Sequence, residues 1–295
     1  MPVGQVMVHH GRAMLGGLRG RRQIGGAGCV LMRSMDDKHI ASSSDSLAVA
    51  HALADAAAAQ SMAWFRRPLD IITKADASPV TLADRAAETA MRDILAARRP
   101  LDGIFGEEHG RERLEAEQVW VLDPIDGTRS FITGSPLWGT LIALLQGGRV
   151  VLGMVDMPVL GERWIGHAGT AQRNGQAVRV RECSELAEAR IVTTSPDIFS
   201  EADWQAFDRL SRRCAMRRFG GDCYGYAQLA GGTIDLVVET GLQPYDYLGP
   251  AGLIEAAGGV ITDWEGRALG LGSDGRVVAA ATPALQRAAL AVLQG

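Results

Sequence analysis

The segment at residues 120–128 constrains this chain more than any other stretch. An apolar run at residues 120–122 leads directly into Asp123 and Asp126, and a glycine–threonine turn follows at residues 127–128. Two like charges this close at the mouth of a strand repel each other unless a cation lies between them. Carboxylate oxygens, together with water and substrate phosphate, are the ligands that suit Mg²⁺. The segment therefore predicts a strand that ends at a metal site, with a solvated Asp-Pro turn as the structural alternative.

The turn after the two acids predicts an anion site. Gly127 and Thr128 offer successive backbone N–H groups, and such groups in a tight turn suit the binding of phosphate. Arg129 follows at once and either adds a positive charge to this site or points into solvent.

Three more acids stand in similar surroundings. Glu107 closes a short apolar run, Asp246 precedes a glycine-rich segment, and Asp84 lies near the start of a helical pattern. Each has an ordinary structural explanation as well. Glu107 fits a solvated turn in which Glu108 is the solvated partner, Asp246 fits a helix N-cap, and Asp84 fits an acid in a first helical turn.

These segments, in this order, resemble the inositol monophosphatase family of Mg²⁺-dependent, lithium-sensitive phosphatases. The resemblance runs from about residue 48 to the C-terminus and includes the whole Asp-Pro-Ile-Asp-Gly-Thr signature at residues 123–128. It implies an α+β fold, a layered α/β/α/β/α sandwich of the sugar phosphatase type, with the site where two halves of the chain meet. It also implies a homodimer that acts on a small phosphomonoester.

The resemblance implies a role for each acid. Asp123 would bridge two cations, because two-metal sites clamp the attacking and leaving oxygens of a phosphoryl transfer. Asp126 and Asp246 would complete the shell of one Mg²⁺. Glu107 and the backbone carbonyl of Ile125 would complete the shell of the other.

Two further roles concern the attacking water and an additional cation. Thr128 would orient the water, with Asp84 as its hydrogen-bonded partner. Lys74 and Asp76 match a loop of the family and would assist a third cation, although a solvated loop explains them nearly as well. Two or three Mg²⁺ ions per site are therefore expected.

A narrower resemblance concerns the substrate. The segments at residues 129–145, 218–224 and 235–242 resemble the branch that hydrolyses histidinol phosphate in histidine biosynthesis. Asp222 stands where the inositol-specific branch usually carries small or hydroxyl residues, and Glu239 is a second acid in this half. Acids suit the ammonium and imidazole groups of histidinol through charge-assisted hydrogen bonds, and surface salt bridges are the alternative.

Three other functions compete with this interpretation. Inositol 1-phosphate and 3′-phosphoadenosine nucleotides are alternative substrates of the same chemistry, but the chain has no aromatic and basic cluster suited to a base and an extra phosphate. A non-catalytic regulator would be favoured if one of the four main acidic and hydroxyl positions were replaced. None is: Asp84, Asp123, Asp126 and Thr128 are all present.

The composition of the chain excludes several other classes of function. A net charge of −4 gives no basic footprint for nucleic acid. Apolar stretches are interrupted by glycine, proline or charge before they reach the length of a membrane span, so no membrane partner is expected. The four cysteines lack the spacing of a zinc site or a disulfide framework, which predicts free thiols in a reducing cytoplasm.

The chain divides into three expected parts. Residues 1–34 hold five arginines and no acid, which fits either a transit peptide or a start assigned too early, with Met35 as the true start. In both cases we expect disorder there. Residues 35–187 should form an α+β half with the metal site, and residues 188–295 an α/β half that recognises the substrate.

Patterning predicts clustered strands first and a mixture of helices and strands later, which argues for an α+β fold. The expected helices are at residues 42–66, 82–97, 203–213, 223–230, 246–257 and 283–293. The expected strands are at residues 103–105, 119–122, 139–145, 150–156, 162–167, 190–194, 234–239, 260–263 and 277–281.

Overall fold

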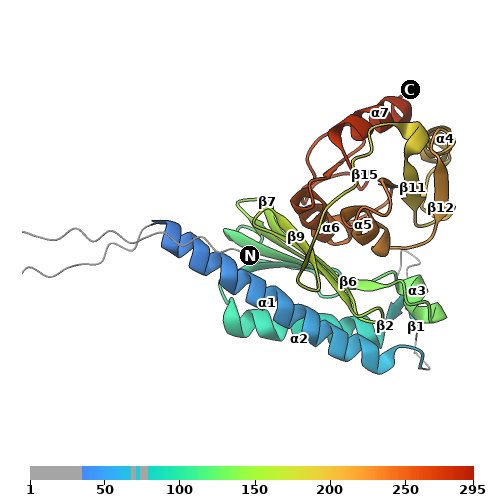
Figure 1. Ribbon diagram of the computed structural model, residues 1–295. Helices are drawn as coiled ribbons and strands as arrows, with labels where there is room; N and C mark the ends of the chain where they lie inside the picture. The colour runs from blue at the N-terminus through green and yellow to red at the C-terminus, as the bar shows by residue number, and fades with distance from the viewer. Residues whose placement is uncertain (1–34, 68–70, 74–78) are drawn as a thin grey trace, which may run out of the picture.

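The computed structural model describes residues 35–67, 71–73 and 79–295. The chain forms five layers in the order helices, sheet, helices, sheet, helices (Figure 1). The expectations for residues 1–34 and for Lys74 and Asp76 lie outside the described residues.

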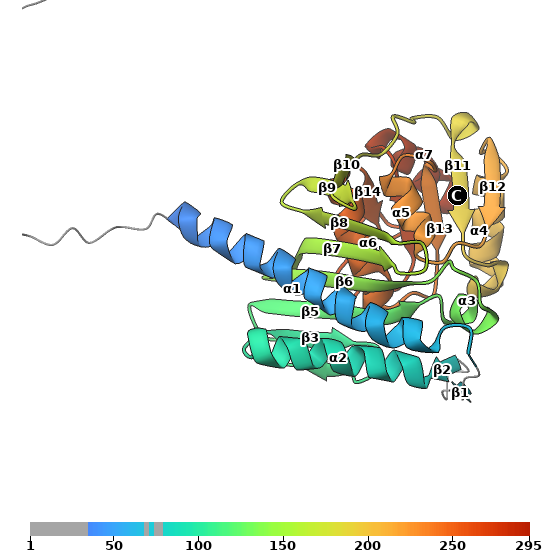
Figure 2. The same cartoon turned by 60° about the horizontal axis from the view of Figure 1, so that its bottom comes forward.

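The first layer is a pair of helices, α1 (Met35–Trp64) and α2 (Leu82–Arg98), which cover one face of the larger sheet (Figure 2). The buried face of α1 consists largely of alanines, among them Ala50, Ala54 and Ala57. Such small side chains allow α1 and α2 to approach closely. The matching face of α2 buries Met91 and Leu95 against the sheet.

The larger sheet has eight strands and is antiparallel except where β3 pairs with β5. Strand β5 lies between β3 and β6, and seven of its nine residues are buried. Both faces of this strand are therefore covered. In spatial order the strands are β10 (Gln176–Val178), β9 (Thr170–Arg173), β8 (Glu162–His167), β7 (Arg149–Met157), β6 (Gly139–Gln146), β5 (Gln118–Asp126), β3 (Gly103–Gly106) and β4 (Arg111–Glu112).

The middle layer consists of α5 (Tyr224–Ala230) and α6 (Pro244–Ala256). Helix α6 packs so closely on the sheet that glycine faces glycine. A Cβ atom added to Gly153 would meet Gly252 Cα at 2.7 Å, and one added to Gly252 would meet Gly153 N at 2.6 Å. No larger side chain fits at either position without displacing backbone.

The second sheet has five strands and carries the last helical layer on its far side (Figure 1). Strand β11 is parallel to both of its neighbours, and the remaining pairs are antiparallel. The strand order is β12 (Met216–Phe219), β11 (Arg190–Thr193), β13 (Leu236–Glu239), β15 (Val277–Ala280) and β14 (Val260–Thr262), and the outer helices are α4 (Glu201–Ser211) and α7 (Pro283–Leu293).

Short elements complete the fold: the hairpin β1 (Ile71–Thr73) and β2 (Pro79–Thr81), helix α3 (Thr128–Thr133), and the 3₁₀ turns η1 (Leu186–Glu188) and η2 (Pro196–Ile198).

The layered α+β sandwich is confirmed. The boundary predicted between the two halves, at residues 187 and 188, precedes β11, and the division into domains stays a prediction. Helix α6 belongs to the second half of the sequence yet packs on the sheet of the first. Among the helices that the structure describes, none combines the length and apolarity needed to span a bilayer.

Candidate active site

The end of strand β5 supplies two carboxylates to one place because the strand is irregular there. In a regular strand, residues three apart point to opposite faces. The register between β5 and β6 shifts between Asp123 and Asp126, and a bulge of this kind redirects side chains. The Thr140 hydroxyl donates to the Pro124 carbonyl at 2.9 Å and ties the irregular segment to β6. Both acids can therefore face the same side.

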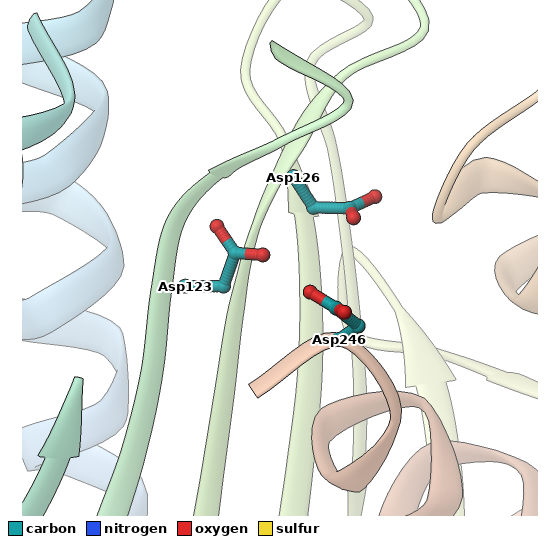
Figure 3. Close-up of side chains that lie close together, drawn as sticks. All are labelled: Asp123, Asp126 and Asp246. Carbon is teal, nitrogen blue, oxygen red and sulfur yellow. The ribbon is translucent and has the colours of Figure 1, made fainter. Parts of the chain in front are cut away.

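The third carboxylate comes from the start of α6. Asp246 is the third residue of this helix, and its Oδ2 accepts the Gln243 N–H at 2.7 Å, which forms a capping box. The predicted helix start at Asp246 was thus two residues late, and Gln243 rather than Asp246 is the N-cap. Capping occupies one oxygen of Asp246, and the side chain is directed toward the two acids of β5 (Figure 3).

The carboxylates of Asp123, Asp126 and Asp246 converge, and each contributes an oxygen within 4.8 Å of the other two (Figure 3). Asp123 and Asp126, like Asp246, are held by backbone amides: Ile125 N–H donates to Asp123 Oδ1 at 3.1 Å, and Cys223 N–H donates to Asp126 Oδ2 at 2.8 Å. The chain has therefore placed three acids together and fixed their orientations.

A cavity of about 200 Å³ opens over these acids. It brings together most of the residues that the sequence singled out, from four separate segments of the chain. Its lining is Glu107, Asp123, Ile125, Asp126, Gly127, Thr128, Arg129, Asp222 and Asp246.

The electrostatics of the cluster are those of a cation site. Burial raises the pKa of Asp123 well above its ordinary value, and the charges of Glu107, Asp126 and Asp246 raise it further. Burial and the neighbouring Asp246 likewise raise the pKa of Asp126. Burial raises the pKa of Asp246 to about 7. Such shifts mean that the charged forms are unfavourable together unless a positive charge offsets them.

The donor set fits a hard divalent cation. It consists of oxygen atoms alone, with three clustered carboxylates and the Glu107 carboxylate on the same cavity. Hard cations such as Mg²⁺ prefer this chemistry, whereas softer metals prefer thiolates or imidazoles. The cluster can therefore hold a metal ion.

The glycine turn lies beside the acids. Gly127 has φ of 84° and precedes α3, a left-handed conformation that suits glycine. The Thr128 hydroxyl donates to the Ile125 carbonyl oxygen at 3.2 Å, so this hydroxyl and the carbonyl predicted to bind a cation are neighbours. Asp84 is 2% exposed and its charge acts on Asp123. The predicted hydrogen bond between Thr128 and Asp84 stays a prediction.

Asp222 lies closer to the turn than the sequence suggested. It adopts φ of 44°, and its Oδ2 accepts the Ser130 hydroxyl at 2.6 Å. A Cβ atom added to Gly127 would come within 3.0 Å of Asp222 Cβ. Asp222 therefore borders the turn predicted to hold phosphate, and is not confined to a remote substrate end. Ser130, which connects the two, was missed because one serine after a glycine turn carries no distinctive signal.

Glu239 lies deeper than expected. It is 3% exposed and does not contribute to the cavity lining. Its two oxygens accept the Thr194 N–H at 2.9 Å and the Tyr226 hydroxyl at 2.8 Å. Its contribution to substrate binding stays a prediction, and any such contribution passes through these partners.

Two neighbours of the site, Glu108 and Arg129, had open or alternative interpretations, and only Glu108 differs from the one expected. The Glu108 side chain is only 2% exposed and lies 3.5 Å from Arg85 Nε, so the interpretation of Glu108 as a solvated acid was wrong. The Arg129 side chain is 75% exposed and its Nη1 is 3.9 Å from Asp197 Oδ2, which places its charge at the rim.

Residues 43–295 match the sequence profile of the inositol monophosphatase family. The chain belongs to this family. The family is metal-dependent, and its members hydrolyse phosphomonoesters, so this chain is a phosphoric monoester hydrolase.

Individual relatives agree with this family. The chain is 50% identical over 223 residues to the bifunctional phosphatase IMPL2, chloroplastic, of Arabidopsis thaliana, which covers 75% of this chain and 64% of that protein. The chain thus spans less than two thirds of the plant protein. It is 36% identical over 236 residues to a histidinol-phosphatase of Chlorobaculum parvum, covering 79% of this chain and 91% of the relative.

A solved inositol monophosphatase from Zymomonas mobilis has the same fold. It superposes with a TM-score of 0.79 at 46% sequence identity and covers 85% of this chain and 98% of its own. Both the sequence and the fold thus support membership of this chain in the inositol monophosphatase family.

Proposed function

We propose that this chain is a Mg²⁺-dependent phosphatase that hydrolyses histidinol phosphate in histidine biosynthesis. The assignment of this substrate rests on Asp222, a half-buried acid that lines the same cavity as the carboxylate cluster. A carboxylate at this place suits a substrate that carries a cation as well as a phosphate. The names of the relatives from Chlorobaculum parvum and Streptomyces coelicolor point to the same substrate.

The proposal assigns the cation ligands as the sequence did. Asp123 would be shared between two Mg²⁺ ions, Asp126 and Asp246 would hold one of them, and Glu107 and the Ile125 carbonyl would hold the other. Their common cavity and the clustered carboxylates support this assignment. Bound Mg²⁺ supplies Lewis-acid stabilisation of phosphoryl transfer and lowers the pKa of a water ligand. Oxygen ligands with several retained waters are typical of this ion.

The remaining residues of the cavity bind and orient the reactants. The backbone N–H groups of Gly127 and Thr128 hold the phosphate, and the Thr128 hydroxyl orients the attacking water with Asp84 behind it. Arg129 at the rim adds positive charge on the approach of an anionic substrate. Lys74 and Asp76 remain the proposed assistants of a third cation.

Inositol 1-phosphate is the second candidate substrate. The Arabidopsis relative is named a bifunctional phosphatase, and the Zymomonas structure is named an inositol monophosphatase. The cation and phosphate ends of the site would serve both substrates alike, so only the part of the cavity near Asp222 distinguishes them.

A substrate panel tests the proposal. The kcat/KM for histidinol phosphate, inositol 1-phosphate and 3′-phosphoadenosine 5′-phosphate would be measured with Mg²⁺ and in the presence of chelator. We expect the largest value for histidinol phosphate and no turnover with chelator. A larger kcat/KM for inositol 1-phosphate would make that compound the substrate and would leave the proposed metal chemistry unchanged.

Three further properties complete the proposal. We place the enzyme in the cytoplasm, which agrees with the free thiols of Cys183, Cys214 and Cys223. We propose a homodimer and inhibition by lithium, both from the family resemblance.

A further inference from the structure

A buried acid outside the cavity holds the loop that carries Glu107. Glu88 lies on α2 and is 0% exposed. Its Oε2 accepts the Glu108 N–H at 2.6 Å and its Oε1 accepts the His109 N–H at 3.1 Å. These amides belong to the two residues that follow Glu107. A single carboxylate thus binds the turn immediately beyond a proposed cation ligand.

Arg92, one helical turn further along α2, binds both Glu88 and the same loop. Its Nε donates to Glu88 Oε1 at 2.8 Å, and its Nη2 donates to the Gly110 carbonyl at 2.6 Å. Its third nitrogen, Nη1, donates to Glu112 Oε1 at 2.6 Å. The planar guanidinium has a fixed fork of donors, so this arrangement sets the distance between α2 and the loop.

The other side of the loop is fixed by backbone. The Glu107 N–H donates to the Leu122 carbonyl at 3.2 Å, next to Asp123, and the Gly106 N–H donates to the Gly110 carbonyl at 3.0 Å. Gly106 leaves no space for a side chain, because an added Cβ would overlap the Glu88 carboxylate. The backbone of Glu107 therefore lies between Leu122 on one side and the Glu88–Arg92 pair on the other.

Helix α2 also carries Asp84, one turn before Glu88. Asp84 and the residues that hold Glu107 are consequently parts of one rigid element, and the charges of Asp84 and Glu107 both act on Asp123. A buried ion pair that only stabilises the fold would explain the contacts of Glu88 and Arg92 but would have no effect on cation binding.

We propose that Glu88 and Arg92 are positioning residues that hold Glu107 in place for cation binding. This inference rests on the ligand role given to Glu107 under the proposed function. Neither residue lines the cavity, so both act through the loop at residues 107–110. Residues that orient metal ligands from behind typically contribute roughly 10- to 100-fold to metal affinity.

The main test is Glu88→Gln in protein stripped of metal and titrated with Mn²⁺, with free Mn²⁺ followed by electron paramagnetic resonance. A glutamine directs an N–H group at one of the two backbone N–H groups that Glu88 binds, and so releases the loop. We expect the Kd for the tightest Mn²⁺ to rise by roughly 10- to 100-fold.

Asp235→Asn is the matched control. Asp235 is also 0% exposed, and it accepts the Arg190 N–H at 2.8 Å and two bonds from the Arg181 guanidinium at 2.8 Å each. Contacts of the same two kinds, to a backbone N–H and to an arginine, therefore exist beside the second sheet, away from the loop of Glu107. We expect Asp235→Asn to lower the Tm while the Kd for Mn²⁺ stays within about twofold.

The variant Glu107→Gln completes a double-mutant cycle. If Glu88 acts through Glu107, adding Glu88→Gln to Glu107→Gln causes little further loss of Mn²⁺ affinity. Independent, multiplied losses would overturn the proposal. So would a Glu88→Gln variant that resembles Asp235→Asn, with a lower Tm and an unchanged Kd.

Arg92→Lys keeps the proposal testable if Glu88→Gln does not fold. Lysine retains the charge but loses the fork that reaches Gly110 and Glu112, so we expect weaker Mn²⁺ binding that again depends on Glu107. An unchanged Kd in Arg92→Lys would contradict the proposal for this residue.

The outcomes separate this inference from the proposed function. Unchanged Mn²⁺ binding in Glu107→Gln removes the ligand assignment and the positioning role together. Weakened binding in Glu107→Gln but not in Glu88→Gln removes the positioning role alone. If the enzyme does not hydrolyse histidinol phosphate, the proposed substrate is wrong, but the conclusions from the Mn²⁺ measurements are unaffected.

Discussion

The Cys223 amide donates to Oδ2 of Asp126 across 2.8 Å. This bond joins the residue before α5 to the last residue of β5, so the orientation of Asp126 depends on the segment that also carries Asp222. The Cys223 thiol packs at 3.7 Å from Met157 Sδ, which anchors this contact in the core. Asp126 accepts this amide and still contributes an oxygen to the cluster with Asp123 and Asp246.

Asp123→Asn is expected to abolish turnover and leave the fold intact. Loss of the central charged ligand should cost about 4 kcal/mol of transition-state stabilisation, which is roughly a thousandfold in kcat. In metal-free protein the same change removes one of several repelling buried charges, so we expect an equal or higher Tm. Thermal melts with and without Mg²⁺ check both points. A variant that keeps near wild-type kcat in Mg²⁺ would falsify the metal assignment.

Metal-free protein should lose stability as the pH rises toward neutrality. Burial raises the pKa of Asp246 to about 7, whereas aspartate in an unfolded chain titrates near pH ~4. Between these values the folded state retains a proton that the unfolded state has released, so folding is favoured at low pH and this advantage is lost as the pH passes 7.

Asp246→Asn isolates this contribution, because asparagine retains an oxygen for the Gln243 N–H. In chelator, the Tm of the variant minus that of the wild type should increase from pH 5 to pH 8. Saturating Mg²⁺ should reverse the order, because the wild type then gains more from the ion. A difference in Tm that is flat across this range would contradict the assigned pKa.

Gly127→Ala should damage activity more than stability. The positive φ of 84° costs an alanine about 1–2 kcal/mol, and the added Cβ would also press on the Asp222 side chain. Gly148→Ala is the control, since Gly148 has φ of 78° and open space around the added atom. We expect similar losses of Tm, but a roughly 100-fold loss of kcat/KM only in Gly127→Ala. Equal activity of the two variants would show that the turn does not position substrate.

Asp222→Asn is expected to weaken turnover of histidinol phosphate by about 10- to 100-fold in kcat/KM, because one charge-assisted hydrogen bond is lost. p-Nitrophenyl phosphate, which carries no cation, should lose less. The proximity of Asp222 to Gly127 makes a control necessary: Ser130→Ala removes the 2.6 Å hydrogen bond but keeps the charge. If Ser130→Ala reproduces the losses of Asp222→Asn on both substrates, Asp222 has a structural role.

The local motifs predicted much of the candidate site. Strand β5, its two acids and the glycine turn are contiguous, so their proximity follows from chain connectivity alone. Glu107 and Asp246 could be added only because the segments resemble a family, since nothing in their own spacing brings residues so far apart together. The structure places all of them on one cavity.

Side-chain direction was the harder part. Glu239 ends a strand and was expected to face the substrate, but Tyr226 and the Thr194 amide, from other elements, draw its carboxylate inward. Glu88 and Arg92 are spaced as i and i+4, a pattern that on most helices marks a solvated ion pair. Their burial depends on the loop at residues 107–110 folding over them, which no local pattern encodes.

The contact between α6 and the larger sheet has a consequence for sequence divergence. Gly153 and Gly252 touch through backbone, so at this point the backbone sets the distance between helix and sheet. Substitutions elsewhere in the core can then accumulate without shifting the start of α6, and the Asp246 carboxylate stays in register with β5.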